Sequence, residues 1–178
     1  MPKLGIAIVG TGMIGAVHRR AALLAGAEVR GVAASSPQRA HEAAHSWNVP
    51  RAYRDIEEVI ADPQVQVVHV CTPNHLHRAM AQAALEAGKH VICEKPLATT
   101  LDDAQALAVL AASTGLVATV PFVYRDHPVV REARARIAQG DLGPLHLIHG
   151  SYLQDWLLDP ASNNWRVDPA LGGTSRVF

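Results

Sequence analysis

The sequence has few cysteines and no excess of charge of either sign. Its 178 residues include only Cys71 and Cys93, which cannot build a disulfide framework and fit a reducing compartment as small buried thiols. The 16 basic and 16 acidic side chains balance, so the chain lacks the electrostatic footprint that binds a phosphate backbone. Long apolar runs are also missing, since the N-terminal run stops at Gly10 and is too short for a signal sequence or a membrane span. We therefore expect a cytoplasmic protein that binds neither nucleic acid nor membranes.

Short β-branched runs alternate with Ala- and Leu-rich stretches of helical spacing, which is typical of an α/β fold. Such nearly continuous apolar runs are expected in a parallel sheet that is covered on both faces. They occupy residues 4–9, 29–33, 65–70, 90–92 and 117–120. Crossover helices are expected over 101–112 and over 13–25, where Ile14, Val17, Ala21 and Leu24 make an apolar stripe. The pattern predicts a doubly wound parallel sheet in residues 1–121.

The pattern changes after residue 120, where prolines separate the remaining segments. A helix is expected over 129–139 and a strand over 145–153, with a glycine-containing turn between them. One helix and one strand cannot close a core of their own. We expect residues 122–178 to be the incomplete start of a second, α+β domain with an exposed edge.

The glycines near the N-terminus have the G-x-G-x-x-G spacing. This spacing follows the first predicted strand and opens the next helix, which is the context of a dinucleotide site. Gly10 would permit the tight turn, Gly12 would let the backbone approach a pyrophosphate, and Gly15 would let the helix pack on the strand. The alternative is a glycine-rich turn without a ligand. The predicted binding segment is Gly10, Thr11, Gly12, Met13, Ile14 and Gly15.

The end of the second predicted strand bears on the choice of coenzyme. NAD sites usually have an acidic residue there for the ribose 2′-hydroxyl. This chain instead has Ser35, Ser36 and Arg39, which could bind a 2′-phosphate. The residues favour NADP over NAD, and a site for both coenzymes stays open. Ser36 could also simply cap the following helix.

The H-E-A-A-H motif at 41–45 matches the pattern of zinc hydrolases. The apolar stripe of its helix runs from Ala40 to Trp47, and His41 and His45 lie about 100–150° away from it, toward solvent. No third ligand follows at a suitable spacing. We reject a zinc hydrolase and expect no metal.

Three segments together closely resemble the Gfo/Idh/MocA family of sugar and inositol dehydrogenases. They are the glycine motif at 10–15, C-T-P-N-H-L-H at 71–77 and C-E-K-P-L at 93–97. Two further matches, Y-R at 124–125 and L-G-P at 142–144, extend the resemblance along the whole chain. The resemblance implies a Rossmann domain followed by the start of a catalytic domain.

The resemblance also implies roles for individual residues. Glu94 would contact the cofactor ribose, and Lys95 would be catalytic by hydrogen bonding the reacting oxygen. Pro96 would follow a cis bond. Both predicted loops follow parallel strands, where open α/β sheets bind ligands. The residues implied to line the nicotinamide are Thr72, Pro73, Asn74 and His75.

The chain departs from the family pattern near residue 178. Relatives continue from a glycine turn into a helix whose histidine commonly acts as acid and base, and that histidine is absent after the glycines at 172–173. One further group of residues in this chain resembles the segment that approaches the substrate in relatives. Its aromatic and polar side chains suit ring stacking and hydrogen bonding. This group is Tyr152, Asp155, Trp156, Trp165 and Arg166.

Two functional hypotheses follow. The favoured one is an NAD(P)-dependent oxidoreductase of a sugar, polyol or inositol, whose complete protein is a homo-oligomer. The alternative is a truncated, non-catalytic NADP-binding protein that pairs with a partner through its exposed edge.

Overall fold

The computed structural model describes residues 3–155, 157–159, 161 and 164–173, and these fall into two compact units. The first unit contains the described residues up to Pro121 together with those from Trp165 onward. The second contains the described residues of Phe122–Asn164. The assignment of 122–178 to a single second domain stays a prediction, and the described residues from Trp165 cluster with the first unit.

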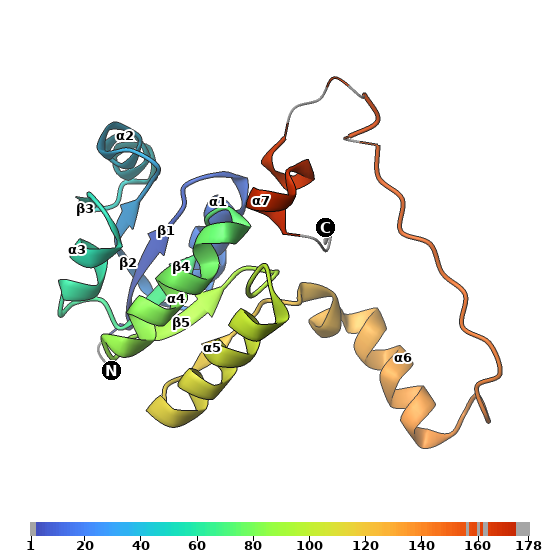
Figure 1. The fold of residues 1–178 in the computed structure, drawn as a ribbon. Coiled ribbons are helices and arrows are strands. Elements are labelled where there is room, and N and C mark those ends of the chain that lie inside the picture. Colours follow the sequence, from blue (N-terminus) through green and yellow to red (C-terminus); the bar gives the residue numbers. More distant parts are fainter. Residues whose placement is uncertain (1–2, 156, 160, 162–163, 174–178) are drawn as a thin grey trace. The chain divides into compact units, whose positions relative to one another are not determined.

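The first unit is built on a parallel sheet of six strands (Figure 1). The strand order is β3-β2-β1-β4-β5-β6, the order of a doubly wound dinucleotide-binding fold. All five predicted strands are present, and the short edge strand β3 is additional. The strands are β1 (Gly5–Val9), β2 (Glu28–Ala33), β3 (Arg51–Tyr53), β4 (Val67–Val70), β5 (His90–Cys93) and β6 (Ala118–Thr119).

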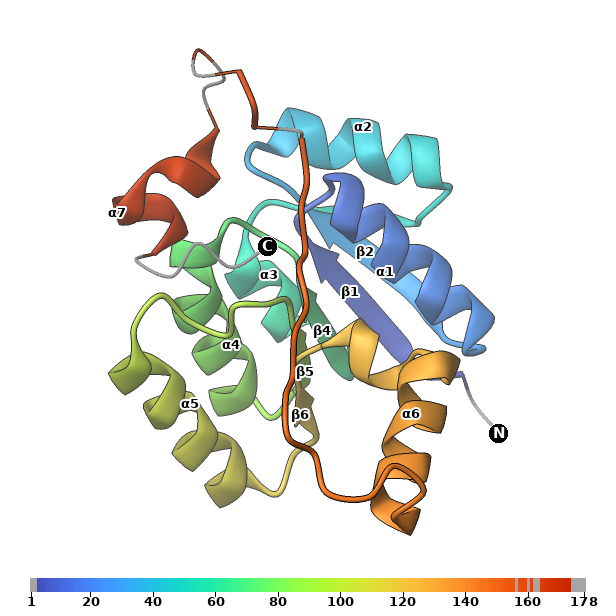
Figure 2. The same ribbon diagram turned by 90° about the vertical axis from the view of Figure 1, so that its right-hand side faces the viewer.

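Helices cover both faces of this sheet, which confirms the predicted fold class (Figures 1 and 2). In β1, Ile6 and Ile8 belong to one core cluster while Ala7 and Val9 belong to the other, as side chains alternate along a strand. The helices on the face of Ile6 and Ile8 are α1 (Met13–Leu24) and α2 (Pro37–Trp47). Those on the opposite face are α3 (Ile56–Ala61), α4 (His77–Glu86) and α5 (Leu101–Thr114).

The prediction of which face of α1 is buried is wrong. Val17 is 54% exposed, and the buried residues of this helix are Gly15, His18 and Ala22. Gly15 sets the rotation, because a Cβ at this position would lie 2.1 Å from the carbonyl oxygen of Gly10. Only a face without a side chain can approach the strand so closely, and this turns the polar His18 inward.

The second unit contains one longer helix and an extended segment. The 3-10 helix η2 (Val123–Asp126) precedes α6 (Pro128–Gln139), which confirms the predicted helix. The strand predicted over 145–153 is wrong, because these residues form no strand in the structure. A strand needs a neighbour for its backbone hydrogen bonds, and no described segment pairs with this one. Its apolar side chains, such as Leu147 and Ile148, are exposed.

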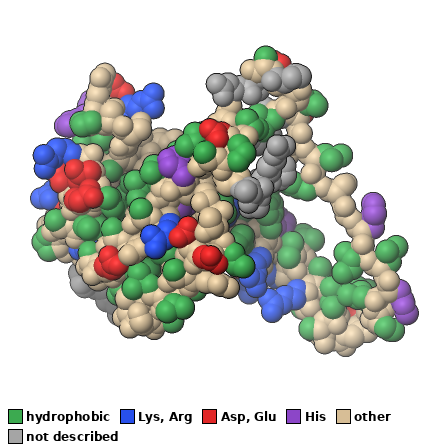
Figure 3. Space-filling view, in the orientation of Figure 1, with side chains coloured by type: hydrophobic (Ala, Val, Ile, Leu, Met, Phe, Trp, Pro, Cys, Tyr) green, Lys and Arg blue, Asp and Glu red, His purple; other side chains and the backbone are tan. Residues whose placement is uncertain are grey.

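Charges of both signs are distributed over the first unit. On the face shown in Figure 3, acidic and basic side chains lie next to one another. Ion pairs of the first unit include Arg51 with Asp62 and Arg78 with Asp103. None of the helices in the described part of the chain is long and apolar enough to cross a membrane.

Candidate active site

The candidate site lies at the carboxyl ends of β1, β4 and β5. The strand order reverses between β1 and β4, and ligands of open α/β sheets bind outside the carboxyl ends at this point. Val9 and Val70 are paired at the ends of β1 and β4, and Val70 is paired with Cys93 at the end of β5. The loops that follow these three strands therefore begin at the same edge of the sheet.

Each glycine of the first loop has a different environment. Gly10 has φ +101°, and a Cβ there would lie 2.4 Å from the carbonyl oxygen of Cys71, so this turn excludes a side chain. At Gly15 the carbonyl oxygen of Gly10 would lie 2.1 Å from a Cβ, so a side chain is excluded there as well. A Cβ on Gly12 would meet no atom of the described residues within 4 Å, so the missing side chain there leaves open space rather than a packing contact.

The N-terminus of α1 presents free backbone amides beside that space. Gly12 is the N-cap and offers no side chain to the first amides, and the first turn contains no acidic residue. Helix N-termini of this kind attract anions, because their amides are unpaired and the helix dipole is positive there. Thr11 is half-buried and Met13 is exposed, whereas Ile14 packs against the core. At Met13 and Ile14 the backbone amides are the groups suited to bind a ligand.

Ser35, Ser36 and Arg39 lie together at the end of β2. The guanidinium of Arg39 donates to the Ser35 hydroxyl at 3.2 Å. Ser36 is the N-cap of α2, and its hydroxyl accepts from the Arg39 amide at 3.3 Å. Ser36 thus has the capping role that the sequence left open, while Ser35 and Arg39 are exposed and able to meet a ligand.

The loop after β4 holds the predicted nicotinamide-side residues. Thr72 and Pro73 are half-buried and His75 is exposed. Asn74 is buried and donates from its side-chain amide to the carbonyl of Gly172 at 2.8 Å. This bond holds the end of α7 (Pro169–Gly172), which follows η3 (Trp165–Val167), against the loop.

The loop after β5 carries the acidic and the basic candidate. Glu94 is buried, and its two oxygens accept from His18 Nε2 and from the Lys95 amide, both at 3.0 Å. Lys95 is half-buried, and among the described residues no group accepts a hydrogen bond from its ammonium. The Lys95-Pro96 peptide bond is cis, as the resemblance implies. The loop therefore fixes the carboxylate and leaves the ammonium available.

A buried polar chain that the sequence analysis missed lies behind Glu94. His18 Nδ1 lies 3.1 Å from Nδ1 of His69 on β4, and the two rings meet nearly edge to face. Burial, and then the neighbouring His18, lowers the pKa of His69 to about 4. Burial opposes ionisation of Glu94, but the hydrogen bonds from His18 and Lys95 and their charges hold the pKa of this carboxyl below its ordinary value. The signal in the sequence was His69 within an otherwise apolar strand.

Neither cysteine is suited to nucleophilic chemistry. Both are free and buried, as predicted. Burial and the charge of Glu94 raise the pKa of Cys93 to about 12, and the same causes, joined by Cys93, raise the pKa of Cys71. Thiols react as thiolates, so these remain inert packing residues at neutral pH.

The structure divides the predicted substrate residues between the two units. Tyr152 and Asp155 are exposed in the second unit, where the Tyr152 hydroxyl lies 2.9 Å from that of Tyr124. Trp165 and Arg166 belong to the first unit, and the Arg166 guanidinium lies 4.4 Å from the centroid of the Trp165 ring. Trp156 lies outside the described residues. A substrate role for these five positions stays a prediction.

The two histidines of the 41–45 motif are exposed on α2. His41 Nδ1 lies 2.7 Å from the carbonyl oxygen of Pro37 in the preceding turn. The described residues contain no group of three or more His, Cys, Asp or Glu side chains that could hold a metal ion.

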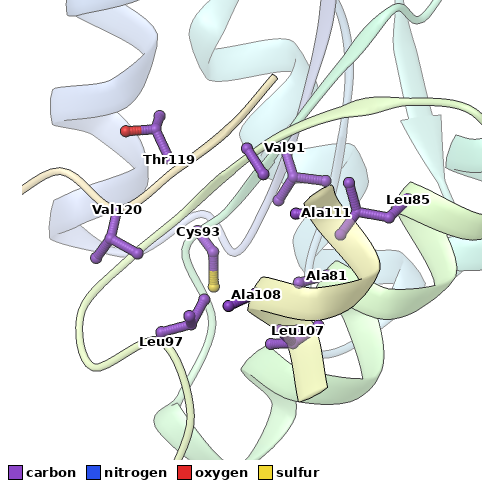
Figure 4. Close-up of a pocket in the computed structure, with 11 residues that line it drawn as sticks. Ala81, Leu85, Val91, Cys93, Leu97, Leu107, Ala108, Ala111, Thr119 and Val120 are labelled. Carbon is purple, nitrogen blue, oxygen red and sulfur yellow. The ribbon is translucent and has the colours of Figure 1, made fainter. Parts of the chain in front are cut away.

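An apolar cavity of about 180 Å³ lies between the β5–β6 edge of the sheet and helices α4 and α5 (Figure 4). Its lining includes Leu85, Leu97, Leu107 and Val120, and it contains no charged side chain. A polyhydroxylated ligand would lose its hydrogen bonds there. The cavity is therefore a gap in the packing rather than the candidate active site.

The fold and the glycine turn define a dinucleotide-binding domain of Rossmann type. Comparison with family models agrees, because residues 4–122 match the oxidoreductase family with an NAD-binding Rossmann fold, and residues 130–176 match the GFO/IDH/MocA C-terminal domain. The chain belongs to the Gfo/Idh/MocA family of oxidoreductases.

Among curated relatives, levoglucosan dehydrogenase of Pseudarthrobacter phenanthrenivorans is 37% identical over 99% of this chain and 48% of its own length. The 1,5-anhydro-D-fructose reductase of Ensifer adhaerens is 37% identical over 83% of this chain and 44% of its own. The chain thus spans about half the length of these relatives.

Solved structures show the same likeness. A levoglucosan dehydrogenase in complex with NADH and levoglucosan aligns with a TM-score of 0.89 at 37% identity, over 97% of this chain and 49% of that one. An inositol dehydrogenase homologue from Azotobacter vinelandii, complexed with NADH and myo-inositol, aligns with a TM-score of 0.75 at 38% identity, over 79% of this chain and 40% of that one.

Proposed function

We propose that the protein is an NAD(P)-dependent oxidoreductase that transfers hydride between the nicotinamide and a carbinol carbon of a sugar, polyol or inositol. The observation that carries the proposal is the meeting of three loops at one end of the sheet. They are the glycine turn after β1, the Thr72–His75 loop after β4 and the loop with Glu94 and Lys95 after β5. The names of the relatives, which are dehydrogenases and reductases of sugars and an inositol, support the substrate class.

The residues present fit a dinucleotide. The open space at Gly12 and the free amides of α1 suit a pyrophosphate, because no atom of the described residues lies within 4 Å of a Cβ placed on Gly12. Ser35 and Arg39 at the end of β2 suit a ribose or its 2′-phosphate, and no carboxylate at this position would repel the phosphate. When bound, the nicotinamide supplies the carrier of the two electrons.

Lys95 has the central role in this proposal. When an alcohol carbon gives up its hydrogen with the electron pair, the oxygen passes its proton to a general base, a role that a histidine commonly has in relatives, and becomes a carbonyl. The negative charge that develops on the oxygen must be stabilised during this transfer. A half-buried ammonium that donates no hydrogen bond to the described residues can hydrogen bond that oxygen. Glu94 would hold the Lys95 backbone through its bond to the amide.

The experiment replaces Lys95 by alanine in the protein as its gene encodes it. Turnover with a panel of sugars, polyols and inositols should fall by about a hundredfold or more, since one stabilising contact to a developing oxyanion is removed. The coenzyme dissociation constant, measured by nicotinamide fluorescence, should stay near the original value. Lys3→Ala is the matched control, because Lys3 is exposed and lies outside the site.

Two results would contradict the proposal. Unchanged turnover in Lys95→Ala would remove the assigned role of this residue. Coenzyme binding by the original protein without oxidation or reduction of any panel member would instead favour the non-catalytic nucleotide-binding protein.

A further inference from the structure

His77, the first residue of α4, is among the most deeply buried side chains of the described residues, with 1% of its surface exposed. Its Nδ1 lies 2.7 Å from the carbonyl oxygen of Pro96, and its Nε2 lies 2.8 Å from the carbonyl oxygen of Thr72. Thr72 belongs to the loop after β4, and Pro96 belongs to the loop after β5. One ring thus contacts both loops of the candidate active site.

Both partners of the ring are carbonyl oxygens, which can only accept hydrogen bonds. Each ring nitrogen must therefore carry a proton to make its bond. A neutral imidazole has one N–H and would direct the lone pair of its other nitrogen at a carbonyl oxygen, which is repulsive at this distance. The two bonds are made together only by the imidazolium form, and bonds from a charged donor are stronger than neutral ones.

We propose that His77 is a positioning residue that clamps the Thr72 loop to the Lys95-Pro96 loop, with both ring nitrogens protonated and donating. The clamp sets the distance between the Thr72 loop, on the nicotinamide side, and Lys95, which would hydrogen bond the reacting oxygen. This inference rests on the proposed function for its kinetic consequence, but not for the protonation of the ring.

His77 differs in this respect from His18 and His69, which form a buried pair. His18 donates to the carboxylate of Glu94 and shares a single proton with His69 through their Nδ1 atoms. Neither His18 nor His69 hydrogen bonds to the described residues of the loop after β4, so they cannot substitute for the link through His77.

Two conservative variants separate the two halves of the clamp. In His77→Asn the amide nitrogen takes the position of Nδ1 and keeps the bond to Pro96, while the bond to Thr72 is lost. In His77→Gln the amide nitrogen reaches the position of Nε2 and keeps the bond to Thr72, while the bond to Pro96 is lost. His45→Asn and His45→Gln are the matched controls, because His45 is exposed on α2.

The two variants should have different kinetic effects. His77→Gln releases the loop of Lys95 and should lower kcat about tenfold to a hundredfold with little change in the KM for coenzyme, since small misplacements of a reacting group are costly. His77→Asn releases the Thr72 loop and should raise the KM for coenzyme about tenfold with a smaller effect on kcat. A purely structural role would affect both parameters alike in both variants.

The protonation state is measured separately by nitrogen NMR on protein labelled at its histidine rings, at neutral pH. The signals of His77 are those that disappear in His77→Gln. Two proton-bearing ring nitrogens support the clamp, and one unprotonated nitrogen overturns it. Identical kinetic effects of the two variants, or none, also overturn it. A protein without coenzyme binding or hydride transfer would refute the proposed function, while the NMR result would still decide the clamp.

Discussion

Gly12 and Gly15 are three residues apart in one motif, but alanine at the two positions should have opposite consequences. At Gly15 an added Cβ would lie 2.1 Å from the carbonyl oxygen of Gly10, about an ångström closer than real contacts of this kind. At Gly12 an added Cβ would lie more than 4 Å from every atom in the described part of the chain, and φ is −72°, which alanine adopts without strain. The first change therefore perturbs packing and the second only the space beside the helix N-terminus.

The expected magnitudes follow from these environments. Gly15→Ala must push α1 away from β1 and should lower the free energy of unfolding by about 2–3 kcal/mol, the usual cost of overpacking a rigid backbone contact. Gly12→Ala should change that free energy by less than about 1 kcal/mol, because a poorer N-cap and a stiffer unfolded chain oppose each other. It should nevertheless weaken coenzyme binding about tenfold or more, since a methyl group would stand where the pyrophosphate approaches.

Urea denaturation and coenzyme titration of both variants distinguish these effects. Gly12→Ala should keep the free energy of unfolding near its original value and weaken coenzyme binding. A Gly12→Ala protein that binds NAD and NADP as tightly as the original would refute the assignment of this turn as the pyrophosphate site. A Gly15→Ala protein of unchanged stability would refute the reasoning from the carbonyl contact.

Two further predictions concern coenzyme choice and pH. Arg39→Ala should weaken binding of NADP about tenfold and leave NAD binding almost unchanged, because a guanidinium pairs with the 2′-phosphate that only NADP carries. An equal loss for both coenzymes in equilibrium titrations would contradict that role, and Arg20→Ala on the exposed side of α1 is the control. The pKa of His69 is about 4 in the folded protein and near 6.5 unfolded, so the unfolded chain binds the proton first as pH falls. The resulting contribution of His69 to the free energy of unfolding, about 3 kcal/mol, is present above pH 6.5 and is lost as pH approaches 4. Glu94, whose pKa is lowered in the folded protein, adds a further loss of stability as pH falls below its ordinary pKa of 4.5. A urea midpoint that stays constant from pH 7 to pH 4.5, or that falls equally in His69→Asn, would disprove this.

Local patterns in the sequence were sufficient to predict the fold of the first unit. The five apolar runs became five of the six strands, and Ser36 caps α2, a role that the sequence left open. These features depend on neighbouring residues, because capping, strand composition and turns are short-range requirements of the backbone. The missed strand β3 has only three residues and lies at the sheet edge, where little burial marks its sequence.

The segment 145–153 shows the limit of such patterns. Its apolar and β-branched composition favours a strand, but composition does not supply a partner for the backbone amides and carbonyls. In the structure the described residues of this segment remain extended and exposed without pairing. A strand is a property of at least two segments, and the sequence of one of them cannot establish it.

The sequence by itself placed the glycine turn and the two loops with Thr72 and Lys95 at the carboxyl ends of parallel strands, and the structure shows that β1, β4 and β5 are neighbours. Only the tertiary structure decided which side chains support them. His18 faces Glu94 because Gly15 fixes the rotation of α1, and Asn74 holds Gly172 across 98 residues of chain. Such contacts depend on helix rotation and strand register, which long-range packing sets, whereas the loops themselves follow from the order of residues along the chain.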